Sequence, residues 1–219
     1  MNVPRDHCIR CGECCLSSSP TLHTEDLDLL REGIIKKGDL YTVRKGELIR
    51  NNIHGRLELA SREMIKVRER LEKEGGCIFY VHEERKCTIY ERRPVQCVAL
   101  KCWDTSEFME VYPREKPCRR DVIEDPLLMA FADKHEERCN YSHLHRYARA
   151  IELAGESAVE GILELLRYDF HMRRFLAENL HLNRNEADLL LGRPLTETIG
   201  MFGLKVVQKG EKEFFLTII

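Results

Sequence analysis

The chain has 219 residues, of which 33% are charged and 43% are apolar, and its formal net charge is -2. This length is enough for one large domain or two small ones with a real apolar core. The nearly balanced charge gives no electrostatic footprint for nucleic acid or an anionic membrane, so we expect neither partner. The start lacks the apolar core of a secretory signal, and no apolar run reaches the roughly 20 residues that span a bilayer. We therefore expect a cytoplasmic protein.

The chain begins with four cysteines within eight residues, Cys8-Ile-Arg-Cys11-Gly-Glu-Cys14-Cys15. Thiols at i and i+3 around a tight turn can reach one metal ion, and Gly12 lets the backbone turn toward them. The side chain of Cys15 leaves the backbone in another direction than that of Cys14. We expect Cys15 to serve a second iron, a second metal or no metal at all.

The next part of the chain alternates helix signals with glycine turns. Capping residues, apolar spacing and glycine stops define the elements that we expect here. In order, these are a loop over 16–23, a helix over 25–32 capped by Thr24 and burying Leu27, Leu30 and Ile34, strands over 40–43 and 47–49, and a helix over 61–74 with Met64, Val67 and Leu71 on one face.

Four further cysteines follow the glycine pair at 75–76. They are Cys77, Cys87, Cys97 and Cys102, separated by short β-prone segments and by Pro94. This pattern predicts a small strand pair or loop that returns the thiols toward the N-terminal run.

The rest of the chain reads as helical. Residues 103–124 are rich in proline and charge, which predicts a surface loop and a boundary between two domains, 1–120 and 121–219. Capping residues and apolar stripes then predict several helices and two final strands. These cover 126–136, begun by Asp125 and Pro126; 142–154, capped by Ser142; 157–180, capped by Ser157, with Val159, Ile162, Leu163, Leu166 and Phe170 as its buried stripe; and 185–191, begun by Asn185. Strands over 204–207 and 213–219 follow, with a turn near Lys209-Gly210. The expected fold is mostly α, of the α+β kind: an irregular cysteine-rich half with short strands, then a helical half with a C-terminal β-hairpin.

The eight thiols at 8, 11, 14, 15, 77, 87, 97 and 102 are best explained as metal ligands, because a reducing compartment disfavours disulfides. They suit two four-ligand sites, or one iron–sulfur cluster with a zinc ion. The bacterial ferredoxin spacing is not met, since the fourth cysteine comes too early and lacks its proline. Spacing alone does not choose between iron and zinc, because tetrahedral thiolate sites suit both.

Residues other than the eight cysteines could bind the metal or lie beside it. His7 and His82 could each replace one thiol, whereas His143 and His145 lie two apart in a helix and do not face each other. Cys118 and Cys139 are expected to be plain thiols. Cations near the cysteines either offset thiolate charge or form an ordinary solvated surface: Arg5, Arg10, Arg85, Lys86, Arg92, Arg93 and Lys101.

The cysteine pattern resembles the CxxCxxCC family of zinc- or iron-chelating cysteine-cluster proteins. The resemblance rests on the N-terminal run, on Gly76-Cys77-Ile-Phe-Tyr, and on Cys87-Thr-Ile-Tyr-Glu-Arg-Arg-Pro94 with Cys97 and Cys102. It implies a bound metal, an iron–sulfur cluster of the 4Fe-4S type in the first place and zinc as the alternative. The cysteine region is also similar to bacterial flagellin lysine N-methylases, which adds methyl transfer as a candidate role.

Three functions follow, in order of preference. The first is a metalloprotein in electron transfer or in the maturation of clusters and metalloenzymes. The second is a methyltransferase-type enzyme that uses the cluster region, and the third is a zinc-stabilised adaptor. In the adaptor, the helical half would bind a partner protein. No dinucleotide-binding or P-loop motif points to another reaction.

Overall fold

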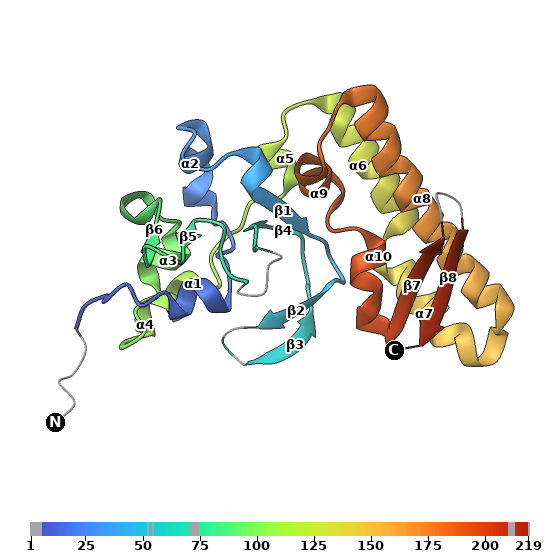
Figure 1. Cartoon of the computed structure of the whole chain (residues 1–219), viewed down its shortest axis with the longest axis horizontal. Coiled ribbons are helices and arrows are strands. Elements are labelled where there is room, and N and C mark those ends of the chain that lie inside the picture. Colours follow the sequence, from blue (N-terminus) through green and yellow to red (C-terminus); the bar gives the residue numbers. More distant parts are fainter. Residues whose placement is uncertain (1–5, 52, 54, 71–74, 210–212, 219) are drawn as a thin grey trace. The chain divides into compact units, whose positions relative to one another are not determined.

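The computed structural model describes residues 6–51, 53, 55–70, 75–209 and 213–218. The chain divides into two compact units: Met1–Tyr41 with Met64–Val122, and Thr42–Glu63 with Ile123–Ile219. Helices predominate and the strands form short antiparallel pairs, which confirms the expected α+β class (Figure 1). In the described ranges, no helix is both long and apolar enough to cross a membrane.

The first unit holds short elements joined by turns. In order, they are α1 (Glu13–Ser17), α2 (Leu27–Arg31), β1 (Leu40–Val43), β4 (Met64–Val67), β5 (Tyr80–Val81), β6 (Lys86–Cys87), α3 (Val95–Ala99), α4 (Ser106–Val111) and α5 (Arg119–Val122). Three 3-10 turns cover Thr24–Asp26, Lys37–Asp39 and Tyr90–Arg92. Strand β1 pairs with β4; Leu40 and Tyr41 of β1 belong to the first unit, and Thr42 and Val43 belong to the second.

The expected helix over 61–74 is wrong where the structure describes it. Residues Met64–Val67 form strand β4, in which Ile65 and Val67 are fully buried and their neighbours are not. Burial of alternate residues is the two-residue period of a strand, and β-branched side chains suit it. Positions 71–74, including Leu71, lie outside the described residues.

Two smaller expectations about the first unit also need correction. Thr24 begins the 3-10 turn Thr24–Asp26, whose N-cap is His23, and the carboxylate of Asp26 accepts the backbone N–H of His23 at 2.8 Å. The helix that follows, α2, buries Leu29 rather than Leu27 or Leu30. The segment 103–124 is not a surface loop, because it forms α4 and α5 and buries apolar side chains of both: Phe108, Val111 and Val122.

The second unit contains a strand pair, a set of longer helices and a C-terminal hairpin. In order, these are β2 (Leu48–Asn51), β3 (Arg56–Leu59), α6 (Pro126–Cys139), α7 (Tyr141–Ala154), α8 (Glu156–Leu180), α9 (Arg184–Leu191), α10 (Leu195–Thr198), a 3-10 turn (Ile199–Phe202), β7 (Leu204–Lys209) and β8 (Glu213–Ile218). The hairpin packs against α8 (Figure 1).

Of the helix starts expected in the second unit, that of α6 is confirmed, whereas α8 follows Gly155 rather than Ser157, and α9 is capped by Asn183, two residues before Asn185. Asp125 accepts the N–H of Leu127 at 2.8 Å and Pro126 occupies the first helical position, as expected. Helix α7 is capped by Asn140 instead of Ser142. The strands of the C-terminal hairpin are confirmed, in a register that pairs Val207 with Phe215, whereas its expected turn lies outside the described residues.

The core of this unit lies between α7, α8 and the hairpin. Side chains from each of these elements are buried together: Cys139, Tyr141, Leu144, Ile162, Leu163, Leu165, Leu166, Leu195, Ile199, Leu204 and Phe214. Of the stripe expected on α8, Ile162, Leu163 and Leu166 are buried here, and Val159 and Phe170 pack against it. The core therefore orients α6, α7 and α8 with respect to one another.

A buried ionic network crosses the same unit. The carboxylate of Asp169 accepts hydrogen bonds from Arg173 Nε at 3.1 Å and from the backbone N–H of Leu195 at 3.0 Å. His135 Nε2 lies 2.7 Å from the same carboxylate, and Arg173 also reaches Asp188 at 2.9 Å. Each buried charge thus has an opposite charge, the condition under which burial is tolerated.

Arg44 is the largest fully buried side chain of the described residues and belongs to the second unit. Its Nη1 donates to the carbonyl of Cys139 at 3.0 Å and lies 3.5 Å from Glu136. The guanidinium stacks on Tyr141, with 4.6 Å between Cζ and the ring centroid. Segment Thr42–Glu63 is therefore anchored by Arg44 to the helices that begin some 80 residues later.

Candidate metal centre

Helix α1 is placed by a glycine that tolerates no side chain. Gly12 has a φ of 84°, in the left-handed region, and precedes the first residue of the helix. A Cβ at this position would overlap the phenol ring of Tyr80, whose hydroxyl donates to the carbonyl of Cys11 at 3.4 Å. Glycine is required here for both its φ and its size. The close approach fixes Cys14 and Cys15 beside strand β5.

The downstream cysteines reach the same region through backbone contacts. The N–H of Cys77 donates to the carbonyl of Cys15 at 2.7 Å, which joins the two cysteine segments directly. Cys87 on β6 pairs with Tyr80 on β5, the residue that covers Gly12. The expected strand pair therefore forms, and it returns two thiols toward α1.

Helix α3 brings a third downstream thiol, Cys97. The first N–H of this helix, at Val95, donates to the buried carboxylate of Asp26 at 2.8 Å. The Gln96 side chain accepts the N–H of Thr21 at 2.6 Å. Both bonds tie α3 to the segment that follows α1, so the position of Cys97 is set by polar contacts of the two residues that precede it.

Cys14 and Cys15 form a thiol pair with their Sγ atoms 3.9 Å apart. The hydrogen bond from Cys15 lowers the pKa of Cys14 to about 6, with a smaller contribution from the positive charge of Arg93. The same bond, together with burial, raises the pKa of Cys15. One proton is thus shared between two sulfurs, and the pair carries a negative charge at neutral pH.

The other thiols of the cluster are harder to ionise than a free thiol. Burial raises the pKa of Cys77 to about 11 and also raises those of Cys87 and Cys97. For Cys97, the charges of Cys77, Cys14 and Cys87 add to this effect. Each thiolate therefore opposes the ionisation of the next, as expected of like charges gathered in one place.

Backbone contacts thus place in one region the segments that carry five of the eight expected ligands, Cys14, Cys15, Cys77, Cys87 and Cys97, and only the Cys14 and Cys15 sulfurs are in direct contact. Cys11 adjoins them through its carbonyl contact with Tyr80, while Cys8 and Cys102 have exposed side chains. All ten cysteines are free thiols. No three ligand-type side chains of the described residues are close enough to hold one metal ion.

The donor set fits zinc or iron. Thiolate sulfurs are the ligands that these metals share, and a cation among them removes the mutual repulsion described above. Two sulfurs bound at about 2.3 Å to one tetrahedral ion are about 3.8 Å apart. The Cys14 and Cys15 sulfurs already have a spacing of this size. The assignment of Cys15 to a second iron, a second metal or no metal stays a prediction.

Most cations near the cysteines are paired with surface carboxylates. Arg92 pairs with Glu32, Lys86 with Glu84 and Lys101 with Glu107; Arg5 lies outside the described residues. These three pairs match the expectation of a solvated surface.

Arg93 is different, and sequence reasoning did not single it out. Its guanidinium stacks on Tyr90 at 3.8 Å, and Arg10 stacks on the same ring at 4.1 Å. Its buried Nε has no hydrogen-bond partner in the part of the chain that the structure describes. Besides the larger effects given above, its charge lowers the pKa of Cys14, Cys87 and Cys97. The segment Arg-Arg-Pro after Cys87 indicated a nearby positive charge, but it did not distinguish Arg93 from Arg92.

The histidines considered as ligands have other contacts. His7 Nδ1 lies 2.6 Å from Asp6, and the ring of His82 packs edge-on against Tyr80. His143 donates from Nδ1 to the carbonyl of Arg138, whereas His145 packs on Phe202, so these two do not face each other.

These contacts define a protein with a thiol-rich centre for a transition metal, held by α1, the β5–β6 pair and α3. Residues 7–119 match the CxxCxxCC family, described as a putative zinc- or iron-chelating domain. The chain belongs to this family. No curated protein and no solved structure matches it.

Proposed function

We propose that the protein is a cytoplasmic iron–sulfur protein of the electron-transfer or cluster-maturation kind. The observation that supports this proposal is the gathering of Cys14, Cys15, Cys77, Cys87 and Cys97 from segments far apart in sequence. An iron–sulfur cluster supplies one-electron transfer at a potential that its ligands, charge and solvent exposure set. Cys8 and Cys102 complete the proposed ligand set, together with Cys11.

The exposure of the thiols suits transfer to or from a partner. Cys77 is buried and Cys97 is partly buried, whereas Cys14 is exposed. The centre thus has one side inside the unit, where burial holds the ligands, and one side open to solvent. A site that is open on one side can pass an electron, or its bound group, to a second protein, whereas a purely structural metal site is closed.

The charges near the thiols suit an anionic centre. Several thiolates around iron carry excess negative charge, which nearby cations and hydrogen-bond donors offset. Arg93 supplies such a charge, and stacking on Tyr90 fixes its guanidinium. We assign Arg93 a positioning role in the proposed function, with no direct bond to the metal.

The experiment is anaerobic purification of the full chain followed by analysis of iron, zinc and acid-labile sulfide. We expect iron and sulfide in comparable amounts, a loss of both in Cys77→Ser, and no change in Cys118→Ser. Cys118 is the matched control because it is a partly buried thiol outside the cluster.

Two results would decide against the proposal. Zinc without sulfide would remove the iron–sulfur assignment and leave a zinc site. Equal metal content in Cys77→Ser and the unmodified protein would remove the assigned ligand set.

A further inference from the structure

His23 is a buried histidine of the first unit that the metal centre does not use. The residue is 0% exposed, and in the part of the chain that the structure describes neither ring nitrogen has a hydrogen-bond partner. A neutral imidazole carries one N–H group, and a protonated imidazole carries two. Protonation of His23 would therefore place a second donor and a full positive charge where solvent does not reach them, which costs free energy.

The charged groups around this ring do not offset a positive charge. The ammonium group of Lys116 opposes protonation of His23, and it is held in place by a hydrogen bond to the carbonyl of Tyr112. The carboxylate of Glu25 favours protonation, but it is exposed and lies 3.5 Å from the guanidinium of Arg114. The ring thus faces a fixed cation and a carboxylate that is already paired.

These surroundings make His23 a weaker base in the folded chain. Burial and the charge of Lys116 lower the pKa of His23 from its ordinary value, about 6.5. Glu25 and the carbonyls of Val111 and Tyr112 act in the opposite direction, each to a smaller extent. Below the ordinary pKa, the unfolded chain then binds more protons at this position than the folded chain. The stability of the folded state therefore falls as the pH decreases.

The segment 21–26 around this ring holds helix α3. The N–H of Thr21 donates at 2.6 Å to the side chain of the second residue of α3. The buried carboxylate of Asp26 accepts the first N–H of α3 and the N–H of His23, both at 2.8 Å. The third residue of α3 is Cys97. A change in this segment thus acts directly on the helix that carries a thiol of the centre.

Two further backbone bonds fix the same segment. The N–H of Leu22 donates to the carbonyl of Ile65 on β4 at 2.9 Å, and the N–H of Thr24 donates to that of Glu115 at 3.2 Å. The buried ring lies between these bonded positions in the sequence. It cannot turn out to solvent without moving the backbone that makes the bonds, including those to α3.

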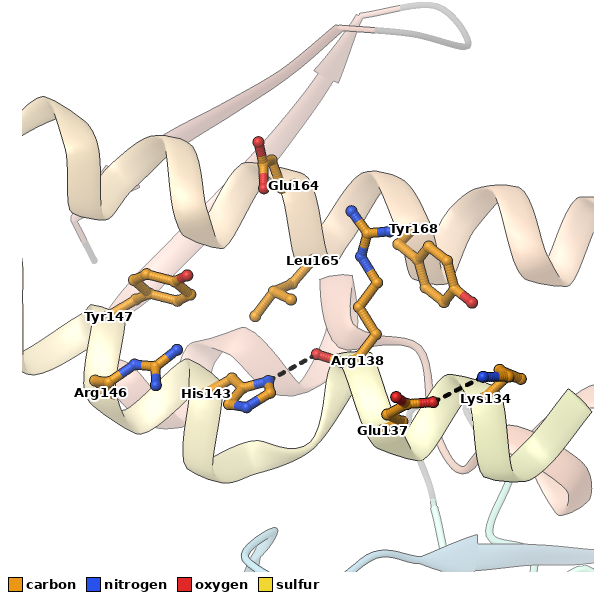
Figure 2. A pocket seen from close by; sticks show the side chains of 9 residues that line it. All are labelled: Lys134, Glu137, Arg138, His143, Arg146, Tyr147, Glu164, Leu165 and Tyr168. Atoms are coloured by element: carbon orange, nitrogen blue, oxygen red, sulfur yellow. Dashed lines mark hydrogen bonds and ion pairs between the residues drawn. The ribbon is translucent and has the colours of Figure 1, made fainter.

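A histidine of the second unit shows a contrasting arrangement. His143 lies on the wall of a pocket between α6, α7 and α8, and its Nδ1 donates to the carbonyl of Arg138 at 2.9 Å (Figure 2). The residue is partly exposed. Nδ1 can donate this bond whether the ring is neutral or protonated. Protonation of His143 therefore requires no movement of the chain.

We propose that His23 is a proton-sensitive switch of the metal centre: its protonation displaces segment 21–26, frees α3 and withdraws Cys97 from the metal. The sulfur of Cys97 keeps the electron pair of the broken bond and takes up a proton. The centre then releases its metal at mildly acidic pH more readily than protonation of the thiolates alone would cause. The switch rests on the proposed centre only in taking Cys97 as a ligand, and it does not depend on which metal is bound.

The first test measures stability in the metal-free full chain. Thermal unfolding is followed at about pH 7.5 and about pH 5.5, on either side of the ordinary histidine pKa. His23→Gln replaces the ring with an uncharged polar side chain that does not titrate. We expect the unfolding midpoint of the unmodified protein to fall between these two pH values by about 2 °C or more beyond the fall in His23→Gln.

The second test measures metal release. The full chain is loaded with Zn²⁺, and release to an excess of chelator is timed at the same two pH values. We expect the acceleration of release at the lower pH to be about threefold or more greater in the unmodified protein than in His23→Gln. Lys116→Gln keeps the ring and removes the cation beside it, so this variant should show a smaller acceleration than the unmodified protein.

His143→Gln is the matched control, and both measurements should show the pH dependence of the unmodified protein. The proposal is overturned if His23→Gln has the unmodified pH dependence in either measurement, if His143→Gln reduces it as much as His23→Gln does, or if the chain binds no Zn²⁺. A purified protein without iron and sulfide would refute the proposed function alone, because the switch is tested with zinc.

Discussion

The substitution Gly12→Ala is the sharpest test of how the metal centre is held. An alanine at a φ of 84° costs about 1–2 kcal/mol for the left-handed conformation. Its Cβ would also overlap the ring of Tyr80, and overpacking of this kind costs about 1–3 kcal/mol more. The sum is about 2–5 kcal/mol. If α1 must dock on Tyr80 for the metal to bind, affinity falls by roughly 30-fold to several thousandfold.

Gly33→Ala is the control that separates strain from the clash. Gly33 also has a positive φ, 72°, but a Cβ there would meet no atom within 4 Å. We expect it to cost only about 1–2 kcal/mol, from backbone strain alone, with metal affinity retained. Competition with a chelator measures metal affinity, and thermal unfolding measures stability. Equal metal affinities in Gly12→Ala and Gly33→Ala would refute the docking of α1 through Tyr80.

Three further changes test other parts of the structure. Arg93→Gln should raise the pKa of Cys14 and slow the alkylation of Cys14 at pH 7 in metal-free protein. Arg92→Gln should leave this rate unchanged. Equal alkylation rates in the two variants would contradict the role of Arg93. Burial alone would raise the pKa of Asp169, but Arg173 and the hydrogen bond from His135 lower it. Asp169 therefore stabilises the fold above pH 3.8, and this contribution is lost on further acidification. Asp169→Asn should lower the free energy of unfolding by about 3–5 kcal/mol at pH 7. It should also weaken the dependence of this free energy on acidic pH, as followed by circular dichroism, and an unchanged dependence would be inconsistent with the role of Asp169. A chelator should lower the unfolding midpoint of metal-loaded protein, because metal binding contributes to folding; a constant midpoint would argue against a structural contribution.

The helical part of the fold could be predicted because its signals are local. Asp125-Pro126 marks a helix start by itself, and the stripe of Ile162, Leu163 and Leu166 shows which side of α8 is buried. Strand β4 could not be predicted in the same way. Met64 and Val67 have helical spacing, and only pairing with β1 turns the segment into a strand. Distant pairing of this kind leaves no local pattern.

The sequence predicted which residues form the candidate site, but it did not predict how they are arranged in space. The cysteines could be named because thiols at such spacings have few other uses in a reducing compartment. The contact of Tyr80 with Gly12 could not be foreseen, since it joins residues 68 positions apart.

The segment anchored by Arg44 limits how the protein can be divided. The family match, 7–119, includes Thr42–Glu63, which belongs to the second unit. A polypeptide cut after residue 119 would keep Arg44 but lose both Glu136 and the Cys139 carbonyl that its guanidinium contacts. Without those residues the Arg44 guanidinium would face water, and Thr42–Glu63 would lose the contacts that order it. Expression of the cysteine region alone would therefore yield a chain with an unsupported insert.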